Sequence, residues 1–306
     1  MRVVFLGNAE WSVPALGALA GAPELEVVLV ITDPPHPLER GSMTAPTPVA
    51  SAARHLRLDL KEVDGIRGHR GLGSLRGARP DVLAVVAYGE ILTAEVLSLP
   101  PLGAINLHFS LLPRWRGAAP VQHALLAGDP TTGVTTTRMD EGLDTGPILA
   151  QRSEPVAPDD DAGTLGERLA SLGAELLVTT LRDLGELAPR AQDGAAVTIA
   201  PKLLPRDRVL DWSEPASSIE RRIRALAPKP GARTRFRGRW LGVLSAEAAE
   251  ASGDPATILG VTERGVLVAA GEGAVRLRTV VPSGRRHMPA PDWANGARFA
   301  PGERLG

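Results

Sequence analysis

The sequence predicts an α/β protein in which a doubly wound, mostly parallel sheet is followed by a small all-β unit. Residues 2–7 and 25–32 have the apolar character of buried strands, and a helical segment lies between them. A strand, a helix and a second strand within about thirty residues form a right-handed βαβ unit. After residue 206 the pattern changes to short strands separated by Gly turns. We therefore expect a first domain over 1–186, a linker over 187–206 and a second domain over 207–306.

The composition fits two folded domains without metal or disulfide support. The chain has 306 residues, of which 43% are hydrophobic, and this is enough for two cores. It contains no Cys, which excludes disulfides and Cys-ligated metals, and its six His show no metal-ligand spacing. Neither a secretory signal nor an apolar run long enough to cross a bilayer is found. We expect a soluble, cytoplasmic monomer that holds no metal.

Several segments of the first domain bear on ligand binding. The turn after the first strand, residues 7–11, lacks G-x-G-x-x-G, so a dinucleotide cofactor is not expected. Residues 32–48 include five prolines and must form an extended loop. Residues 58–63 indicate a short edge strand, and residues 81–88 a buried central strand. Ligands of open α/β sheets bind outside the carboxyl ends of strands, so the turn over 88–92 is a candidate binding segment.

A cluster of polar side chains lies in the next predicted strand. Asn106, His108 and Ser110 are spaced two apart in an apolar run that reads as a strand, so they are expected to share one face. A second strand over 134–139 leads into a Gly-rich, acidic turn that contains Asp144. The amide can donate to a developing oxyanion, the imidazole can move a proton, and the carboxylate can orient the imidazole or a water. The three groups could serve acyl transfer, but a His in an apolar strand is more often structural, so these residues alone leave both interpretations open.

These side chains belong to a longer pattern: Asn106-x-His108-x-Ser110-x-x-Pro113-x-x-Arg116-Gly117, followed by Asp140-x-Gly142-x-Asp144-Thr145-Gly146. The pattern closely resembles that of the formyltetrahydrofolate-dependent formyltransferases. The resemblance implies a Rossmann-like domain that moves a formyl group from 10-formyltetrahydrofolate to an amine, with Asn106, His108 and Asp144 at the catalytic positions. It also implies that the following residues hold the folate: Tyr88, Gly89, Glu90, Ile91, Leu92, Ser110, Leu111, Leu112, Pro113, Asp140 and Gly142.

The second domain is predicted to be a small β-barrel with one helix over 219–227. From residue 205 onward the chain carries 17 Lys or Arg against 11 Asp or Glu, a net charge of +6, whereas the rest carries −7. The asymmetry indicates either an anionic partner or an ordinary solvated surface. The strand pattern is typical of an OB-like barrel, which often binds nucleic acid. The predicted strands cover 234–237, 240–244, 256–261, 265–269 and 274–280.

The C-terminal part is similar to that of the methionyl-tRNA members of this family, in Asp211-Trp212, residues 223–231 and residues 284–288. The similarity implies charged initiator methionyl-tRNA as the partner. Those members carry a substrate-binding loop at 32–48, usually richer in Lys than this chain. Alternating Arg residues in a strand over 234–237 and its flank share one face. The predicted tRNA contacts are Arg40, Gly41, Arg221, Arg222, Arg224, Arg233, Arg235 and Arg237.

Three other functions use parts of the same pattern. A sugar-nucleotide N-formyltransferase would share the first-domain chemistry, but the basic C-terminal barrel would lack a purpose. A formyltetrahydrofolate hydrolase would use water as the acceptor with the same residues. A non-enzymatic RNA-binding module would not need Asn106, His108 and Asp144 together. The sequence therefore favours formyl transfer to a tRNA-bound amine.

Overall fold

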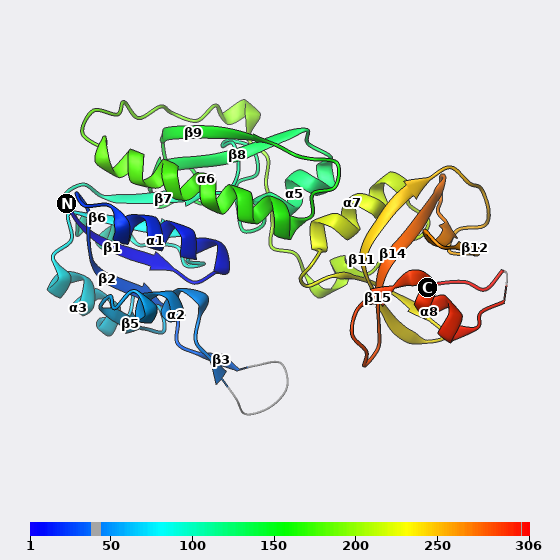
Figure 1. Ribbon diagram of the computed structural model, residues 1–306. Coiled ribbons are helices and arrows are strands. Elements are labelled where there is room, and N and C mark those ends of the chain that lie inside the picture. Colours follow the sequence, from blue (N-terminus) through cyan, green and yellow to red (C-terminus); the bar gives the residue numbers. More distant parts are fainter. Residues whose placement is uncertain (38–43, 301) are drawn as a thin grey trace. The chain divides into compact units, whose positions relative to one another are not determined.

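The computed structural model of the protein describes residues 1–37, 44–300 and 302–306 (Figure 1). Contacts divide the chain into two compact units. Unit 1 comprises Met1–Pro120, Thr131–Pro155 and Gly166–Pro201. Unit 2 comprises Val121–Pro130, Val156–Leu165 and Lys202–Gly306, so it includes two short segments that precede the linker. The limits expected from the sequence, at residues 186 and 206, stay a prediction.

Unit 1 contains a seven-stranded sheet with the strand order β5-β2-β1-β6-β7-β8-β9. The first five strands in this order are parallel, whereas β8 runs antiparallel to both of its neighbours. The predicted doubly wound, mostly parallel sheet is confirmed. The chain builds outward from β1 to β5 and then returns to β6 on the other side of β1, so β1 and β6 flank the topological switch point. The strands are β1 (Arg2–Gly7), β2 (Glu26–Thr32), β5 (Leu60–Glu62), β6 (Val82–Val86), β7 (Ala104–His108), β8 (Thr131–Arg138) and β9 (Ile148–Pro155).

The burial of the strands follows their place in the sheet. All five residues of β6 are buried, as expected for a central parallel strand with both faces covered. The sequence does not predict β9, because this edge strand is buried only at its beginning and becomes polar and exposed after Leu149. Two-residue strands β3 (His36–Pro37) and β4 (Thr44–Ala45) pair with each other in the Pro-rich loop.

Helices pack on the sheet and decide which face of β7 is free. A Cβ atom on Gly173 of α6 would lie 2.8 Å from Leu107 Cδ2, so α6 lies against the face of β7 that carries Leu107 (Figure 1). Asn106 and His108 alternate with Leu107 and therefore point to the opposite face. Among the described residues before Lys202, the helices are the 3₁₀ turn η1 (Glu10–Ser12), α1 (Val13–Gly21), α2 (Pro48–His55), α3 (His69–Ala78), α4 (Ala94–Ser98), α5 (Pro120–Ala127), α6 (Ala162–Arg182) and the 3₁₀ turn η2 (Gly194–Ala196).

Unit 2 contains an antiparallel sheet with the order β10-β11-β14-β13-β12, and β15 pairs with β14. The last residues connect its two outer strands: Leu305 bridges Phe236 of β10, and Arg304 bridges Thr257, which precedes β12. The predicted second domain of short strands is confirmed and is an antiparallel sheet, and its assignment to an OB-like barrel stays a prediction. The strands are β10 (Ala232–Phe236), β11 (Arg239–Ala249), β12 (Ile258–Thr262), β13 (Gly265–Ala269), β14 (Ala274–Pro282) and β15 (Met288–Pro289).

Two α-helices lie in the described part of unit 2 after residue 201, where the sequence predicts one. Helix α7 (Ala216–Leu226) buries Ile219, Ile223 and Leu226 in the core of the unit. Helix α8 (Ala290–Ala297) was not predicted, because it is short and contains Pro and Gly. Its Trp293 packs edge-to-face on Phe236 with ring centroids 5.2 Å apart, and this tertiary contact holds a segment of weak helical propensity.

Candidate active site

The three predicted catalytic side chains meet at the end of β7. Asn106 and His108 come from the free face of that strand, and Asp144 comes from the loop between β8 and β9. Asp144 Oδ1 accepts a hydrogen bond from Asn106 Nδ2 at 3.2 Å and lies 3.6 Å from His108 Nδ1. Its other oxygen, Oδ2, accepts from the backbone N–H of Gly117 at 2.8 Å. The carboxylate is thus fixed between an amide, an imidazole and a main-chain donor.

The orientation of the His108 ring is set by the Trp115 carbonyl oxygen, 2.9 Å from Nε2. Because a carbonyl oxygen can only accept, Nε2 carries a proton, and Nδ1 is the ring nitrogen that faces Asp144. The Nδ1 to Oδ1 distance is longer than a hydrogen bond, so Nδ1 can exchange a proton with a group that enters the site. His108 is only 6% exposed, so few waters compete for that nitrogen.

The backbone at Asp144 is strained. Its φ is +52°, in the left-handed region, which costs a non-Gly residue on the order of 1–3 kcal/mol. The strain aims the carboxylate at β7 from a loop that is otherwise exposed. Asp140 shapes the start of this loop, because its Oδ1 accepts from the Gly142 N–H at 3.0 Å and from Thr145 Oγ1 at 2.6 Å. Asp140 and Gly142 therefore support the turn in this structure.

The predicted shared face of Asn106, His108 and Ser110 is wrong for Ser110, because β7 ends at His108. Beyond that residue the chain turns into a loop. Ser110 is fully buried, its Oγ donates to the Arg114 carbonyl at 2.6 Å, and its own carbonyl accepts from Thr135 Oγ1 at 2.6 Å. Thr135 Oγ1 also accepts from the Leu112 N–H at 3.1 Å. Ser110 and Leu112 therefore brace the loop, and Leu111 and Pro113 are half-buried beside them.

The loop after β7 closes tightly at Gly117. The φ of Gly117 is +120°, and a Cβ atom there would lie 2.6 Å from the carbonyl oxygen of Ala200. Only glycine meets both conditions without a shift of the backbone. Gly117 is also the donor to Asp144, so the same close approach that demands glycine positions the carboxylate.

The predicted folate turn lies at the carboxyl end of β6, beside the switch point. Gly89 has a φ of +87°, and Leu92 is buried whereas Ile91 is 55% exposed. The Glu90 carboxylate is occupied by protein groups, since it accepts from the Ile66 N–H at 2.7 Å and from Arg67 Nε at 2.8 Å. Tyr88 is buried, and its hydroxyl has no hydrogen-bond partner. Burial and, to a lesser degree, the charges of Glu90 and Asp33 raise the pKa of Tyr88, so this hydroxyl stays a neutral donor.

Sequence reasoning missed Asn8, which bridges the switch point. Its Nδ2 donates to the Tyr88 carbonyl at 2.5 Å and to Asp33 Oδ2 at 2.9 Å. Its Oδ1 accepts from Thr32 Oγ1 and from the Asp33 N–H, both at 2.8 Å. The side chain thus joins the ends of β1, β2 and β6. An amide directly after the first strand of a doubly wound sheet is the signal that could have indicated it.

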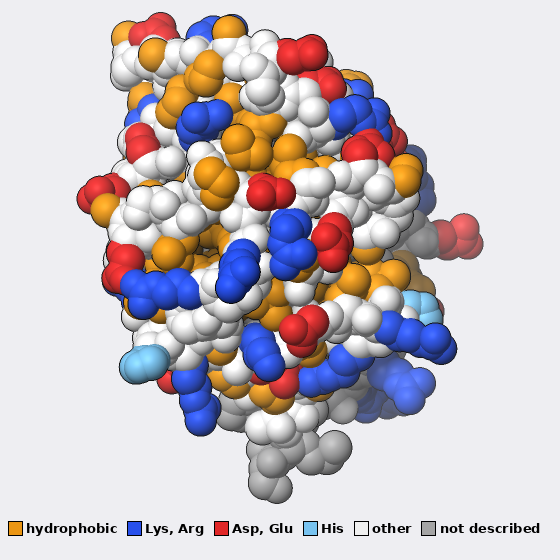
Figure 2. All heavy atoms as spheres, turned by 90° about the vertical axis from the view of Figure 1, so that its left-hand side faces the viewer, with side chains coloured by type: hydrophobic (Ala, Val, Ile, Leu, Met, Phe, Trp, Pro, Cys, Tyr) orange, Lys and Arg blue, Asp and Glu red, His pale blue; other side chains and the backbone are white. Residues whose placement is uncertain are grey.

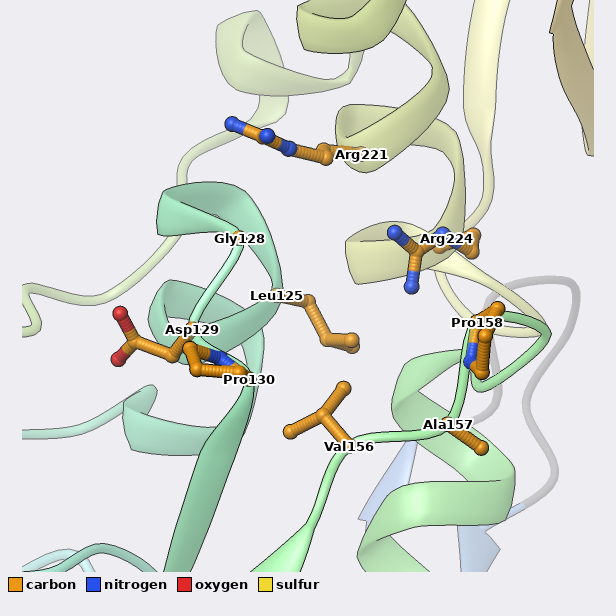
Figure 3. A pocket seen from close by; sticks show the side chains of 9 residues that line it. All are labelled: Leu125, Gly128, Asp129, Pro130, Val156, Ala157, Pro158, Arg221 and Arg224. Carbon is orange, nitrogen blue, oxygen red and sulfur yellow. The ribbon is translucent and has the colours of Figure 1, made fainter.

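Most of the arginines predicted to bind tRNA have partners within unit 2. Arg222 pairs with Glu214, and Arg224 pairs with Glu220 and donates to the Asp160 carbonyl at 3.0 Å. Arg221 lies against Gly128, where a Cβ atom would come within 2.5 Å of its guanidinium carbon (Figure 3). Arg221 and Arg224 border a cavity of about 180 Å³ that is otherwise lined mainly by apolar and Pro side chains (Figure 3). Arg40 and Gly41 lie outside the described residues.

Arg233 and Arg235 share one face of β10, and both guanidinium groups lie over the ring of Trp240, at 4.0 and 4.1 Å from its centroid. The predicted place of Arg237 on that face is wrong, because β10 ends at Phe236. Arg237 and Gly238 form a two-residue hairpin turn with φ values of +47° and +74°. The Arg237 guanidinium pairs instead with both Glu303 oxygens, at 3.0 and 2.6 Å.

The described residues contain no group of three or more His, Cys, Asp or Glu side chains placed to hold a metal ion. Within the same ranges, no helix is long and apolar enough to cross a membrane.

The fold and the site define an enzyme of the formyl transferase class, and comparison with known proteins agrees. The chain belongs to the formyl transferase family: residues 1–181 match the formyl transferase domain, and residues 202–298 match the formyl transferase C-terminal domain. It is 46% identical to methionyl-tRNA formyltransferase of Thermus thermophilus, over 100% of this chain and 99% of that protein. It is 44% identical to methionyl-tRNA formyltransferase of Halorhodospira halophila, over 99% and 98% of the two chains.

Solved structures share the fold. HypX from Aquifex aeolicus, in complex with tetrahydrofolic acid, superposes with a TM-score of 0.63 at 16% identity. The superposition covers 96% of this chain and 47% of HypX. At this identity the likeness concerns the fold alone.

Proposed function

We propose that this protein transfers the formyl group of 10-formyltetrahydrofolate to the α-amine of methionine on the initiator tRNA. The observation that carries the proposal is the placement of Asp144 between Asn106 and His108. Family membership and the full-length similarity to methionyl-tRNA formyltransferases support the choice of donor and acceptor. The protein acts as a monomer in the cytoplasm.

The residues at the switch point fit a pterin-bearing co-substrate. Tyr88 supplies a buried donor without a partner, which is a group that a bound ligand would satisfy. The turn over 88–92 supplies backbone groups at the carboxyl end of a central strand, where open α/β sheets bind ligands. We assign the folate to this turn and to the loops that follow β7 and β8.

The formyl donor supplies an electrophilic carbonyl carbon, and attack by the amine places a negative charge on the carbonyl oxygen. Asn106 uses one amide hydrogen for Asp144, and its second hydrogen is available to that oxygen. His108 Nδ1 accepts the amine proton or, once protonated, donates to the oxyanion. The Asp144 carboxylate, 3.6 Å from Nδ1, stabilises the positive charge that this ring then carries. When the negative charge returns to the carbonyl, the bond between the formyl carbon and the folate nitrogen breaks, and tetrahydrofolate leaves with the proton that His108 took from the amine. No covalent enzyme intermediate is required.

Unit 2 provides the tRNA contacts in this proposal. Arg233 and Arg235 are held by Trp240 on one face of β10, so their guanidinium groups are pre-organised before a phosphate binds. Arg221 has no hydrogen bond or ion pair among the described residues, and its charge is available to a phosphate as well.

The test is to incubate the pure protein with 10-formyltetrahydrofolate and charged initiator tRNA and to measure formyl-methionine released from the tRNA. Parallel reactions contain uncharged tRNA, an amino-sugar nucleotide, or no acceptor. We expect formyl-methionine only with the charged tRNA. Formate release without an acceptor, at the rate seen with tRNA, would show a hydrolase, and formylation of the amino-sugar alone would show a sugar-nucleotide enzyme.

A further inference from the structure

Residues 190–200, which we call the strap, run across both loops of the active site and belong to unit 1. Arg190 exchanges two backbone hydrogen bonds with Ile148, each at 2.8 Å, next to the Asp144 loop. Further along, the Arg116 N–H donates to the Thr198 carbonyl at 2.9 Å, and the Ala200 N–H donates to the Arg116 carbonyl at 2.7 Å. One end of the strap is therefore hydrogen-bonded beside the Asp144 loop, and its other end is hydrogen-bonded to the loop that follows β7.

The side chain of Gln192 lies between these two attachments. Its Nε2 donates to the Asp144 carbonyl at 2.8 Å and to the Gly146 carbonyl at 2.7 Å. Its Oε1 accepts from Arg116 Nε at 3.0 Å and from Arg116 Nη2 at 2.7 Å. Both N–H groups and the carbonyl oxygen are occupied, so the amide is fully satisfied by protein groups.

The hydrogen bonds of Gln192 hold the loop at Asp144, whose backbone conformation is strained. Asp144 holds a left-handed backbone conformation, and such a conformation persists only where the surroundings over-determine it. Gln192 donates hydrogen bonds to the carbonyl oxygens of Asp144 and Gly146. On the opposite side, Arg116 is bonded to Gln192 while its neighbour Gly117 donates to the Asp144 carboxylate. Gln192 thus closes a ring of contacts that sets the position of the carboxylate relative to His108.

We propose that Gln192 is a positioning residue for formyl transfer, and that through it the strap is a structural part of the active site. This inference rests on the proposed function only in its kinetic test, which requires that the protein formylates charged tRNA. Gln192 acts through Asp144 and does not itself need to reach the reacting atoms.

The chemistry of the site explains why a glutamine stands here. Glu has the same length and can still pair with Arg116, but it cannot donate to two carbonyl oxygens. Leu has a similar volume and offers neither a donor nor an acceptor. Gln192→Glu therefore removes the donor end alone, whereas Gln192→Leu removes both ends. A matched control is Asp193→Ala, which removes a hydrogen bond inside the strap, to the Ala195 N–H, without touching either catalytic loop.

The kinetic test compares the three variants with the wild type in steady-state turnover with charged initiator tRNA. Misplacement of a catalytic group by a fraction of an ångström to one ångström costs up to about 100-fold in rate. We expect Gln192→Glu and Gln192→Leu each to lower kcat by about 10- to 100-fold, to change KM for folate and tRNA by less than about threefold, and to alter the pH profile of kcat. Asp193→Ala should retain the wild-type rate and profile. A wild-type kcat in Gln192→Glu would overturn the proposal.

A second measurement does not depend on the acceptor. Hydrogen exchange of the full-length protein should become faster in residues 139–148 in both Gln192 variants, and unchanged in β1, β6 and β14. Equal exchange in that loop for wild type and Gln192→Leu would reject the positioning role, whichever amine the enzyme formylates. If the wild type does not formylate charged tRNA, the proposed function fails, and the exchange comparison still decides the role of Gln192.

Discussion

At the scale of single residues, the site is organised by the capacity of each atom to donate or accept. Trp115 uses its carbonyl to fix one nitrogen of His108, and Gly117 uses its N–H to fix one oxygen of Asp144. What remains free is one hydrogen of the Asn106 amide and Nδ1 of His108. The Asn106 amide nitrogen and His108 Nδ1 lie beside the same oxygen of Asp144, so an oxyanion and a proton can be handled within a few ångströms.

Replacing Asn106 with Ala should lower kcat by about 100- to 1000-fold, because one preorganised donor to the oxyanion is lost. The side chain is half-buried at a strand end, so the melting temperature should change little. Quenched single-turnover assays measure the rate of formyl transfer, and circular dichroism shows whether the fold is retained. A rate within tenfold of wild type would remove Asn106 from the mechanism.

Replacing Asp144 with Asn should lower kcat far more than it weakens folate binding. The substitution keeps the shape and the Gly117 hydrogen bond but removes the charge that stabilises protonated His108. That charge stabilises the transition state rather than the bound folate, so its removal should lower kcat and leave folate affinity nearly unchanged. Equilibrium folate binding and single-turnover rates, measured on the same preparation, separate the two effects. Normal turnover with weak folate binding would make Asp144 a binding residue instead.

At the scale of elements, the sequence is a reliable guide where burial is high on both faces of a strand. β1, β2 and β6 are apolar runs, and their order as a doubly wound sheet follows from their connections. Strand ends are less predictable, because the point where a chain turns depends on tertiary contacts. Ser110 and Arg237 each lie just beyond the last residue of a strand, and both were given the wrong face for that reason.

Long-range contacts account for what the sequence could not show. The hydrogen bonds of Gln192 join residues 48 and 46 positions away in the chain, so no local pattern marks them. Asn8 likewise joins Tyr88 across 80 positions. That Asn106, His108 and Asp144 lie together was predictable, because their motif is dense in sequence. Their supports were not, because they come from other elements.

The turn between β10 and β11 provides a pH-dependent prediction. A hydrogen bond from Arg237, and then one from the Ala300 N–H, hold the pKa of Glu303 below its usual range. A carboxyl with a lowered folded-state pKa contributes stability above its unfolded pKa, and that contribution is lost as the pH falls through the folded value. Arg237→Gln should therefore lower the melting temperature at neutral pH, and the gap from wild type should narrow below about pH 4.5.

Thermal unfolding of both proteins across about pH 3 to 7 measures this gap. Arg264→Gln, which removes an exposed positive charge from another hairpin, serves as the control. A gap between wild type and Arg237→Gln that is constant with pH would show that Glu303 is not the partner that matters.

At the scale of the whole molecule, the two units do not correspond to two stretches of sequence. Unit 2 holds the main chain of 121–130 and 156–165, and within it the Gly163 N–H donates to the Ala227 carbonyl at 3.3 Å. A protein cut after residue 204 would therefore lose the partners of these segments. Point substitutions on unit 2 are a cleaner way to separate tRNA binding from chemistry than removal of the C-terminal part.

Charge is also distributed unevenly between the parts of the chain. Figure 2 shows one face on which Lys and Arg side chains are interspersed with Asp and Glu. Some arginines of the described residues form surface ion pairs, such as Arg2 with Glu26 and Arg76 with Glu95, which contribute little to stability. From residue 205 onward the net charge is +6, and it is this excess that can attract a polyanion.

Replacing Arg233 and Arg235 with Gln should therefore make tRNA binding less dependent on salt. Each phosphate contact contributes roughly 0.7 to 0.9 to the log–log slope of affinity against salt, so the double variant should flatten the slope by up to about 1.4 to 1.8. Arg237 is left unchanged, because Glu303 already occupies its guanidinium.

The matched control is Arg264→Gln with Arg278→Gln, which removes the same charge from arginines beside Glu247. Binding is measured over a salt series for the three proteins, with folate affinity expected to stay the same in all of them. Parallel slopes for wild type and Arg233→Gln/Arg235→Gln would show that this face of β10 does not touch the tRNA, and an equal flattening in the control would assign the effect to net charge rather than to the Trp240 site.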